Sequence, residues 1–162
     1  MNEVVIMLGS NMGDRQHHLH TANNLIASSA GSIKLQSKIY ETASWGDTSQ
    51  QSFYNQAIRI STDLAALDLL HLLLGIENQM GRKRNRKWEP RIIDLDIIYY
   101  NTDVIKTAEL TIPHPLLQER RFVLVPLAEI VPSFIHPVLH KDTLTLLAEC
   151  MDDGSVTELQ IR

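Results

Sequence analysis

The order of hydrophobic and polar positions predicts strands that alternate with helices along the chain. Residues 4–8 form an apolar, β-branched run before a Gly-Ser-Asn sequence, which is typical of a buried strand. Polar and apolar residues alternate over 33–40 and again over 54–60, as in half-buried strands. Apolar residues at helical spacing follow Asp14 and Asp63, and we therefore expect a helix to begin at each of these positions.

The second half of the chain continues the alternation in shorter elements. A strongly β-prone run covers 92–100, and we expect 104–105 to pair back onto it as a hairpin. Short helices are predicted over 122–130 and 144–151, and a last strand over 156–161. Because the two alternating segments suit antiparallel pairing, the pattern favours an α/β sandwich (α+β) with a largely antiparallel sheet over a doubly wound parallel sheet.

The composition fits one globular domain. The chain has 162 residues, of which 44% are hydrophobic and 21% charged, and no linker divides it, so we expect a single domain over 1–162. The lone Cys150 excludes an internal disulfide framework and a zinc site built from cysteines. The first residues lack the basic start and long apolar core of a signal peptide, and no apolar run could span a bilayer. We therefore expect a cytoplasmic protein with no membrane partner.

The charge is unevenly distributed. The formal net charge of −4 by itself argues against a nucleic-acid-binding protein. Residues 82–91, however, hold six basic residues and one acidic residue, a net +5, whereas the other 152 residues hold nine basic and eighteen acidic residues, a net −9. The chain is therefore an acidic body with one concentrated positive segment, which is too crowded with like charge to pack in a core.

Two carboxylates interrupt the apolar run that follows this segment. Strand side chains alternate between the two faces of a sheet, so Asp94 and Asp96 face one side and Leu95 faces the other. Two such carboxylates repel each other unless a cation compensates, and Mg²⁺ prefers oxygen ligands of this kind. The alternative is a pair on a solvent-facing edge strand, where charge prevents aggregation. The pair alone leaves both interpretations open.

The position of the basic segment bears on that choice. It ends at Arg91, three residues before Asp94, and cations beside metal-binding carboxylates are what polyphosphate transfer requires. The planar fork of arginine suits this role, because it binds two phosphate oxygens at once. A solvated loop or a nucleic-acid-binding patch is the alternative interpretation of the segment. The common signatures of nucleotide-binding loops, zinc proteases and serine hydrolases are absent from the sequence.

A histidine and several aromatic residues are further candidates. His114 lies between two prolines, whose fixed φ angles could aim the imidazole at a phosphate or metal, although the pattern by itself favours an ordinary exposed turn histidine. Arg120 could join the same anion site. Trp45 lies in a polar stretch where core packing is less obvious, although aromatic residues are more often core than ligand contacts. Asn55 follows Phe53 on the same strand face, and its amide could pair with the edge of a heterocycle.

Taken in order, these elements resemble the 6-hydroxymethyl-7,8-dihydropterin pyrophosphokinase family over nearly the whole chain. The motifs that carry the resemblance are Leu8-Gly9-Ser10-Asn11, Tyr40-Glu41-Thr42, Phe53-Tyr54-Asn55-Gln56-Ala57, Glu77, Gly81-Arg82-x-Arg84, Trp88-x-Pro90-Arg91-x-x-Asp94-Leu95-Asp96-Ile97-Ile98, Pro113-His114-Pro115 and Arg120-x-Phe122-x-Leu124-x-Pro126-Leu127. The Pro-Arg-x-x-Asp-Leu-Asp element is specific by itself, and the ordered set is far more so.

The resemblance implies a ferredoxin-like three-layer sandwich, with a mostly antiparallel central sheet flanked by helices. It implies transfer of diphosphate from ATP to the pterin hydroxymethyl group, with release of AMP, by a monomer that binds these small molecules and no nucleic acid. The site residues that it implies are Asp94 and Asp96 for two Mg²⁺ ions, Arg82 and Arg91 for the charge of the transferring phosphates, Arg84, His114, Arg120 and Glu77 for ATP, and Gly9, Thr42, Ala43, Trp45, Phe53, Asn55 and Phe122 for the pterin.

Two departures from the family pattern leave an alternative. Glu89 stands where the family usually has Gly or Ala, and Ala43 stands where Pro is common. Glu89 adds an acid to the basic segment, which motivates the alternative of a catalytically impaired homologue that still binds pterin and ATP. A nucleic-acid-binding module that uses 82–91 is the third possibility, and the overall acidity counts against it.

Overall fold

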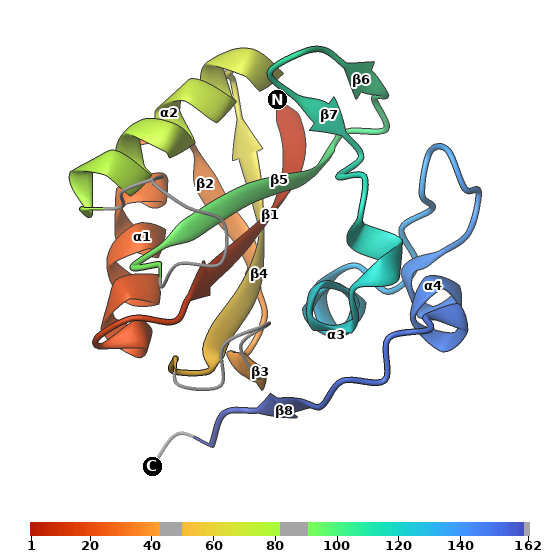
Figure 1. The fold of residues 1–162 in the computed structure, drawn as a ribbon. Coiled ribbons are helices and arrows are strands. Elements are labelled where there is room, and N and C mark those ends of the chain that lie inside the picture. The colour runs from red at the N-terminus through yellow and green to blue at the C-terminus, as the bar shows by residue number, and fades with distance from the viewer. Residues whose placement is uncertain (43–49, 82–90, 161–162) are drawn as a thin grey trace.

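A central sheet lies between two layers of helices in the computed structural model, which describes residues 1–42, 50–81 and 91–160 (Figure 1). The helices are α1 (Arg15–Ser29), α2 (Ala66–Gln79), α3 (Arg121–Ile130) and α4 (Thr143–Glu149), with a 3₁₀ helix, η1, at Leu117–Glu119. The first two cover one face of the sheet, and the last two lie on its other side. The predicted three-layer sandwich is therefore confirmed.

The sheet is antiparallel throughout the described residues. Its strands are β1 (Asn2–Ser10), β2 (Ser32–Gln36), β3 (Tyr40–Thr42), β4 (Phe53–Thr62), β5 (Asp94–Tyr100) and β8 (Val156–Glu158). They lie in the order β5-β1-β4-β3-β8, with β2 also paired to β4. The central position of β1, between β4 and β5, and the helices that follow β1 and β4 give the ferredoxin-like arrangement. The terminal strand predicted over 156–161 is confirmed over its first half.

The segment 33–40 differs from its prediction, because it forms two strands rather than one. Ser37 separates them: its N–H donates to the carbonyl of Ala57 at 2.8 Å, and its Oγ accepts the N–H of Ala57 at 2.9 Å. The serine side chain thus replaces a rung of the backbone ladder with β4. The predicted antiparallel pairing is confirmed, and the continuity of the strand is wrong.

The two helix starts differ in their chemistry. Asp14 caps α1 as predicted, since its carboxylate accepts the N–H of His17 at 3.1 Å. The prediction that Asp63 begins the next helix is wrong, because α2 begins at Ala66 and has no side-chain cap. The hydroxyl of Thr62 instead accepts the N–H of Leu64 at 3.1 Å, which delays the helix by a short turn.

The predicted hairpin of 104–105 with the preceding strand is wrong. The short strand β6 (Ile105–Lys106) pairs with β7 (Thr111–Ile112) in a separate sheet. Asn101, at φ 50°, explains the difference: its N–H donates to the carbonyl of Glu3 at 2.8 Å, and its Oδ1 accepts the N–H of Glu3 at 2.9 Å. These bonds fasten the turn to β1, so the chain leaves the sheet instead of folding back on β5.

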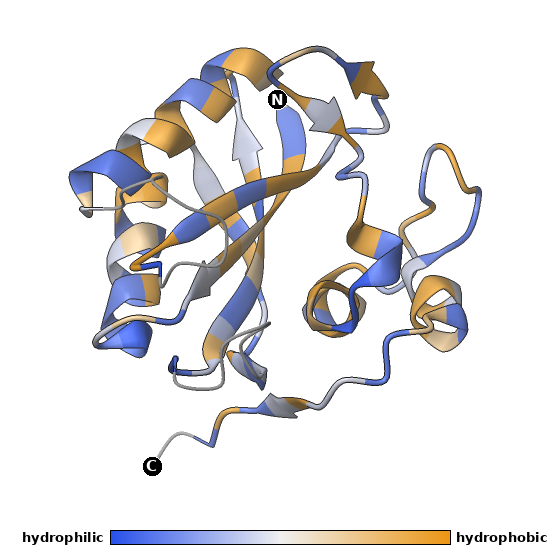
Figure 2. Cartoon of the chain, in the orientation of Figure 1, coloured by the Kyte–Doolittle hydropathy of each residue, from blue (hydrophilic) through white to orange (hydrophobic). Residues whose placement is uncertain are grey.

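The hydrophobic core is divided between the two faces of the sheet. One cluster joins alternate residues of β1, such as Ile6, to α1 and α2, and the other joins Met7 and its neighbours to α3 and α4. Figure 2 shows hydrophobic residues on the central strands and on the helices of both layers. Neighbouring residues of one strand therefore face different helix layers. Only alternate residues of a strand can lie on the same side of the sheet as the site.

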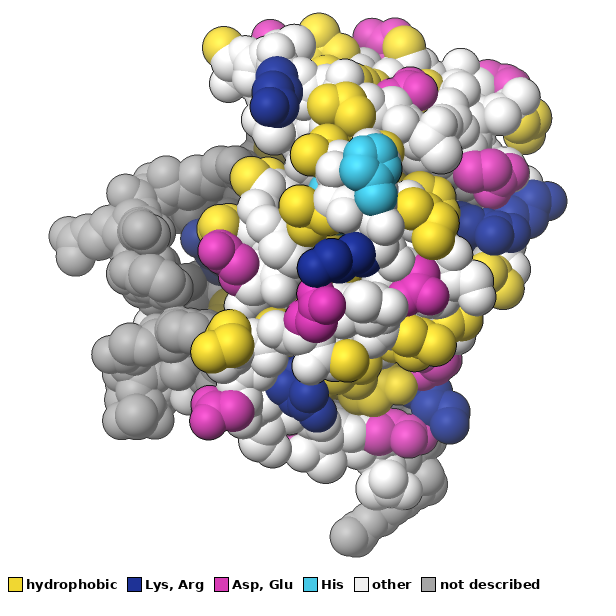
Figure 3. Space-filling view, turned by 90° about the vertical axis from the view of Figure 1, so that its right-hand side faces the viewer, with side chains coloured by type: hydrophobic (Ala, Val, Ile, Leu, Met, Phe, Trp, Pro, Cys, Tyr) yellow, Lys and Arg dark blue, Asp and Glu magenta, His cyan; other side chains and the backbone are white. Residues whose placement is uncertain are grey.

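Exposed apolar side chains occur near the C-terminal end, in the loop before α4 and on α4 itself. They are Ile135, Val138, Leu139 and Leu144. On the face of the molecule shown in Figure 3, hydrophobic side chains are mixed with acidic and basic ones. Within 1–42, 50–81 and 91–160, no helix has the length and apolar character needed to cross a membrane.

His136 makes the stability of the loop before α4 dependent on pH. Its side chain is buried, at 5% exposure, and Nδ1 accepts the N–H groups of Val138 and Leu139 at 3.1 and 3.0 Å. Burial, and then the charge of His140, lowers the pKa of His136 below its ordinary value of 6.5. The unfolded chain therefore takes up this proton more readily, so the contribution of His136 is present above pH 6.5 and lost as the pH falls below it.

We expect the wild-type free energy of unfolding to fall between pH 7 and pH 5, and to fall less in a His136→Asn variant. The asparagine oxygen can accept the same N–H groups but does not titrate. Urea unfolding at both pH values measures the difference. His20→Asn, on the exposed side of α1, is the control and should keep the wild-type pH dependence. Equal pH dependence in wild type and His136→Asn would contradict the prediction.

Candidate active site

A pocket of about 380 Å³ opens where β1, β4 and β5 approach η1 and α3. It lies on the α3 side of the sheet, because it is lined by Met7, Phe53 and Ile98, which point away from α1 and α2. The full set of described residues that line it is Met7, Gly9, Thr42, Gln50, Phe53, Asn55, Arg91, Asp94, Asp96, Ile98, His114, Glu119, Arg120, Phe122 and Val123.

Asp94 and Asp96 line the pocket together, as the strand alternation predicts, while Leu95 between them points into the core. Strand β5 is at an edge of the sheet, so the edge position considered from the sequence is also observed. The carboxylates nevertheless face a pocket rather than open solvent. The guanidinium of Arg91 donates to Asp94 Oδ2 at 2.9 Å, which places a cation beside the pair.

The carboxylate pair fits a hard divalent cation that takes its other ligands from a substrate. Carboxylate oxygens are ligands that Mg²⁺ prefers, and Mg²⁺ commonly uses one or two of them with substrate phosphates. Among the described residues, no group of three or more His, Cys, Asp or Glu side chains could hold a metal ion by itself. The donor set therefore suits an ion that arrives with a phosphate ligand.

Glu77 is behind the carboxylate pair and does not line the pocket. Its side chain is buried, at 1% exposure, and Oε2 accepts the N–H of Leu95 at 2.8 Å. A buried carboxylate that accepts a backbone N–H is stabilised by that bond. In this structure Glu77 thus fixes the segment of β5 between the two aspartates, and the predicted contact with ATP has no support in its position.

His114 lines the same pocket as the aspartates, in a neutral form. Its Nδ1 accepts the N–H of Leu116 at 3.2 Å, so the remaining proton is on Nε2. Burial, followed by the charge of Arg120, lowers the pKa of His114, and the charge of Asp94 opposes this with a smaller effect. The backbone N–H of His114 donates to the carbonyl of Ile98 at 3.1 Å and holds the residue against β5. A neutral imidazole with an Nε2–H group is a hydrogen-bond donor suited to an anion.

The other end of the pocket is less charged. Asn55 is buried, at 4% exposure, and its Nδ2 donates to Thr42 Oγ1 at 3.2 Å. Gly9 lies directly beside it, since a Cβ on Gly9 would be 2.8 Å from Asn55 Oδ1. Phe53 and Phe122 add aromatic surface to the same cavity. An amide, a hydroxyl and two aromatic rings form a subsite for a flat heterocycle.

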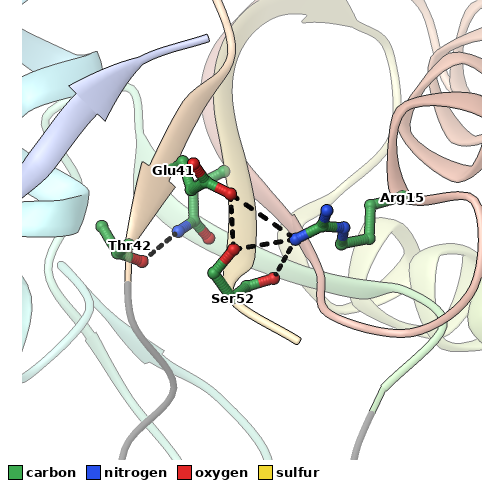
Figure 4. Close-up of polar contacts among 5 residues, drawn as sticks. Arg15, Glu41, Thr42 and Ser52 are labelled. Carbon is green, nitrogen blue, oxygen red and sulfur yellow. Dashed lines mark hydrogen bonds and ion pairs between the residues drawn. The ribbon is translucent and has the colours of Figure 1, made fainter. Parts of the chain in front are cut away.

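A polar network lies across the sheet from this end of the pocket (Figure 4). Arg15, the first residue of α1, donates from Nη1 to the carbonyl and the Oγ of Ser52, both at 2.8 Å. The Ser52 hydroxyl donates to Glu41 Oε2 at 2.6 Å. No sequence motif marks this set, because the pairing of β3 with β4 brings Glu41 and Ser52 together and the packing of α1 on the sheet adds Arg15.

The structure brings together most of the residues predicted for the site. Ten of them line one pocket, and they are Gly9, Thr42, Phe53, Asn55, Arg91, Asp94, Asp96, His114, Arg120 and Phe122. Ala43, Trp45, Arg82, Arg84 and Glu89 lie outside the described residues. Gln50 and Glu119 also line the pocket and were missed, because neither has a sequence signal that separates it from an ordinary polar loop residue.

The family model of 7,8-dihydro-6-hydroxymethylpterin-pyrophosphokinase (HPPK) matches residues 5–132. The chain is 46% identical over 132 residues to the 2-amino-4-hydroxy-6-hydroxymethyldihydropteridine pyrophosphokinase of Bacillus subtilis, covering 80% of this chain and 79% of that protein. It is 41% identical over 136 residues to the protein of the same name from Methylorubrum extorquens, covering 83% and 86%.

Other relatives are larger proteins. The chain is 43% identical over 155 residues to the folic acid synthesis protein FOL1 of Dictyostelium discoideum, covering 96% of this chain but only 23% of that protein. Among solved structures, wild-type HPPK-DHPS of Plasmodium falciparum matches with a TM-score of 0.75 at 19% identity, over 92% of this chain and 43% of that one. At that identity the structural match shows the fold alone.

Proposed function

The chain belongs to the 7,8-dihydro-6-hydroxymethylpterin-pyrophosphokinase family, and we propose that it transfers diphosphate from ATP to the hydroxymethyl group of 6-hydroxymethyl-7,8-dihydropterin. The products are the pterin diphosphate and AMP, in folate biosynthesis. One observation carries the proposal: a single pocket joins the subsite of Asn55 and the two phenylalanines to the cluster of Arg91, Asp94, Asp96 and His114. One end suits a heterocycle, and the other suits a polyphosphate.

The pterin binds at the apolar end. Its ring lies between aromatic side chains, and Asn55 pairs with its polar edge while Thr42 Oγ1 keeps the Asn55 amide oriented. Gly9 forms the floor, since any larger residue would meet Asn55. Ala43 and Trp45 are proposed to complete this subsite, as the family resemblance implies.

The ATP phosphates bind at the charged end. Arg91, Arg120 and the Nε2–H group of His114 face that part of the pocket and donate to phosphate oxygens. Arg82 and Arg84 are proposed to add further positive charge from the basic segment. Asp94 and Asp96 would hold two Mg²⁺ ions, which would supply positive charge to neutralise the ATP phosphates.

The reaction is an in-line displacement at the β-phosphorus of ATP. A bond forms between the pterin hydroxyl oxygen and the β-phosphorus, the bond from that phosphorus to the α–β bridging oxygen breaks so that AMP leaves, and the hydroxyl proton passes to solvent. No general base is assigned, because phosphoryl transfer depends mainly on positioning and electrostatic stabilisation. Asn55 aligns the nucleophile, Arg91 stabilises the charge that moves, and Glu77 keeps β5 and its aspartates in register.

The experiment that tests the proposal is AMP formation by the purified protein with ATP, hydroxymethyldihydropterin and Mg²⁺. Sustained turnover supports the enzyme. Binding of both substrates without turnover would instead indicate the catalytically impaired homologue that Glu89 suggested. Anisotropy titrations with single-stranded and duplex oligonucleotides test the remaining alternative, a nucleic-acid-binding module. We expect this protein to show only weak, salt-sensitive binding to them.

Gly9→Ala is expected to raise the KM for the pterin by about 10-fold, with the KM for ATP within about 2-fold of wild type. The new Cβ would lie 2.8 Å from Asn55 Oδ1, so the amide must turn away from its pairing position. Steady-state kinetics with each substrate varied in turn measures the two constants.

Gly75→Ala is the matched control. A Cβ on Gly75, within α2, meets nothing within 4 Å, so both KM values should stay at the wild-type level. Alanine in place of a helical glycine should also add about 0.5–1 kcal/mol to the free energy of unfolding. A Gly9→Ala protein with an unchanged pterin KM would contradict the assignment of the pocket floor.

A further inference from the structure

We propose that Arg15 is a positioning residue for the pterin, which fixes the pterin-binding wall of the pocket from the opposite face of the sheet. The inference rests on the proposed function, because it names a residue that acts on the pterin subsite. Arg15 does not line the pocket, and within the described part of the chain its hydrogen bonds, ion pair and ring contact are to Ser52, Glu41 and Tyr54, none of which is assigned to the pterin.

The contacts of Arg15 join the two strand ends that form this wall. Its Nη1 donates to the carbonyl and the hydroxyl of Ser52 at 2.8 Å, and it lies 3.7 Å from Glu41 Oε2. The Ser52 hydroxyl donates to the same Glu41 oxygen at 2.6 Å, which closes the triangle seen in Figure 4. Glu41 belongs to β3, and Ser52 immediately precedes β4.

The residues next to these two in sequence are pocket residues. Thr42 follows Glu41, Phe53 follows Ser52, and Thr42 and Phe53 are directly paired across β3 and β4. Because side chains alternate along a strand, Glu41 and Ser52 point to the α1 face while their neighbours point into the pocket. A displacement of either strand end on the α1 face therefore moves Thr42 or Phe53 on the other.

The guanidinium is held more firmly than a surface ion pair. The Arg15 side chain is 16% exposed, and its Cζ lies 3.8 Å from the centre of the Tyr54 ring. Tyr54 is the partner of Glu41 across the two strands. The planar guanidinium thus stacks on the Tyr54 ring and also donates to Ser52. A lysine ammonium can reproduce this arrangement only in part.

The backbone pairing between β3 and β4 is short at this point. Pairing of β3 with β4 covers three residue pairs and ends at Thr42 with Phe53. Thr42 also pairs with Val156 of β8, so backbone bonds hold β3 on its other side, and side-chain contacts add to the short ladder on the β4 side. Arg15 supplies those contacts, and the Thr42 hydroxyl then orients Asn55.

Arg15→Gln tests the inference by equilibrium titration, with 6-hydroxymethylpterin fluorescence as the pterin probe and a non-hydrolysable ATP analogue as the second ligand. We expect pterin affinity to fall by about 10-fold and ATP-analogue affinity to stay within about 2-fold. Arg15→Lys should recover part of the loss, and Ser52→Ala should show a smaller loss of the same kind. Thermal melting, measured in parallel, shows whether each variant is folded.

Arg59→Gln is the matched control, since it removes an arginine that pairs with Glu3 at 3.4 Å further along β4. Its affinity for both ligands should equal that of wild type. Equal losses for both ligands in Arg15→Gln, or the same pterin loss in Arg59→Gln, would overturn the inference. Absence of AMP formation by wild type would overturn the proposed enzyme function, whereas the pterin titration would still decide the role of Arg15.

Discussion

Replacement of Asp96 by alanine is expected to lower the rate of AMP formation by about 1,000-fold or more, because a metal ion contributes several kcal/mol of charge stabilisation to such a reaction. Asp96 lines the pocket on the same face of β5 as Asp94, and the two are the carboxylates that this strand presents to the charged end. Removing one of them halves the carboxylate ligand set. The rate with saturating ATP, pterin and Mg²⁺ gives the magnitude.

Pterin binding by the Asp96→Ala variant distinguishes a specific loss of turnover from misfolding. Asn55 is held by the hydroxyl of Thr42 and lies beside Gly9, on strands other than β5, so the Asp96→Ala protein should still bind 6-hydroxymethylpterin with near-normal affinity. Asp103→Ala is the control, since Asp103 lies beyond the other end of β5 and should leave turnover unchanged. Near-normal turnover of Asp96→Ala would contradict the role assigned to the carboxylate pair.

The sequence predicted best where a local pattern determines the structure. Alternation along a strand is a property of the backbone, so the placement of Asp94 and Asp96 on one face followed directly from their spacing. The cap at Asp14 is similarly local, because the carboxylate bonds a backbone N–H only three residues away. Such features depend little on the rest of the fold.

The errors arose where a distant residue decides the outcome. The hairpin at 104–105 fails because Asn101 bonds to Glu3, which is 98 positions away in sequence. The strand over 33–40 breaks because Ser37 bonds to Ala57. Polar residues of this kind compete with regular pairing, and no window of neighbouring residues reveals which partner the fold brings near.

The candidate site shows the same difference between features set by local sequence and features set by distant contacts. The family resemblance predicted a set of catalytic and ligand-binding residues, and ten of them line the pocket. It grouped Glu77, which accepts the N–H of Leu95, with residues that line the pocket. It also offered nothing on Arg15, whose role depends on which helix face packs on β4. Residues that act through others are identified by their contacts rather than by their type.

Arg91→Ala is expected to reduce turnover by about 100-fold, the loss typical of removing one donor that stabilises transition-state charge. The backbone of Arg91 is held independently of its side chain: its N–H donates to Asn11 Oδ1 at 2.6 Å, and its carbonyl accepts the N–H of Asn11 at 3.0 Å. The substitution should therefore leave the local chain path intact. What it removes is the guanidinium that donates to Asp94 at 2.9 Å and faces the pocket.

Two further variants test whether the loss of turnover is specific to the Arg91 guanidinium. Arg91→Lys keeps the charge but not the fork that can bind Asp94 and a phosphate together, so it should recover only part of the rate. Arg121→Ala is the control, because Arg121 does not line the pocket although it is adjacent to Arg120. A guanidinium that acts mainly on the moving charge lowers kcat, whereas one that acts only on ATP binding raises the KM for ATP with kcat unchanged. The second pattern would contradict a catalytic role for Arg91.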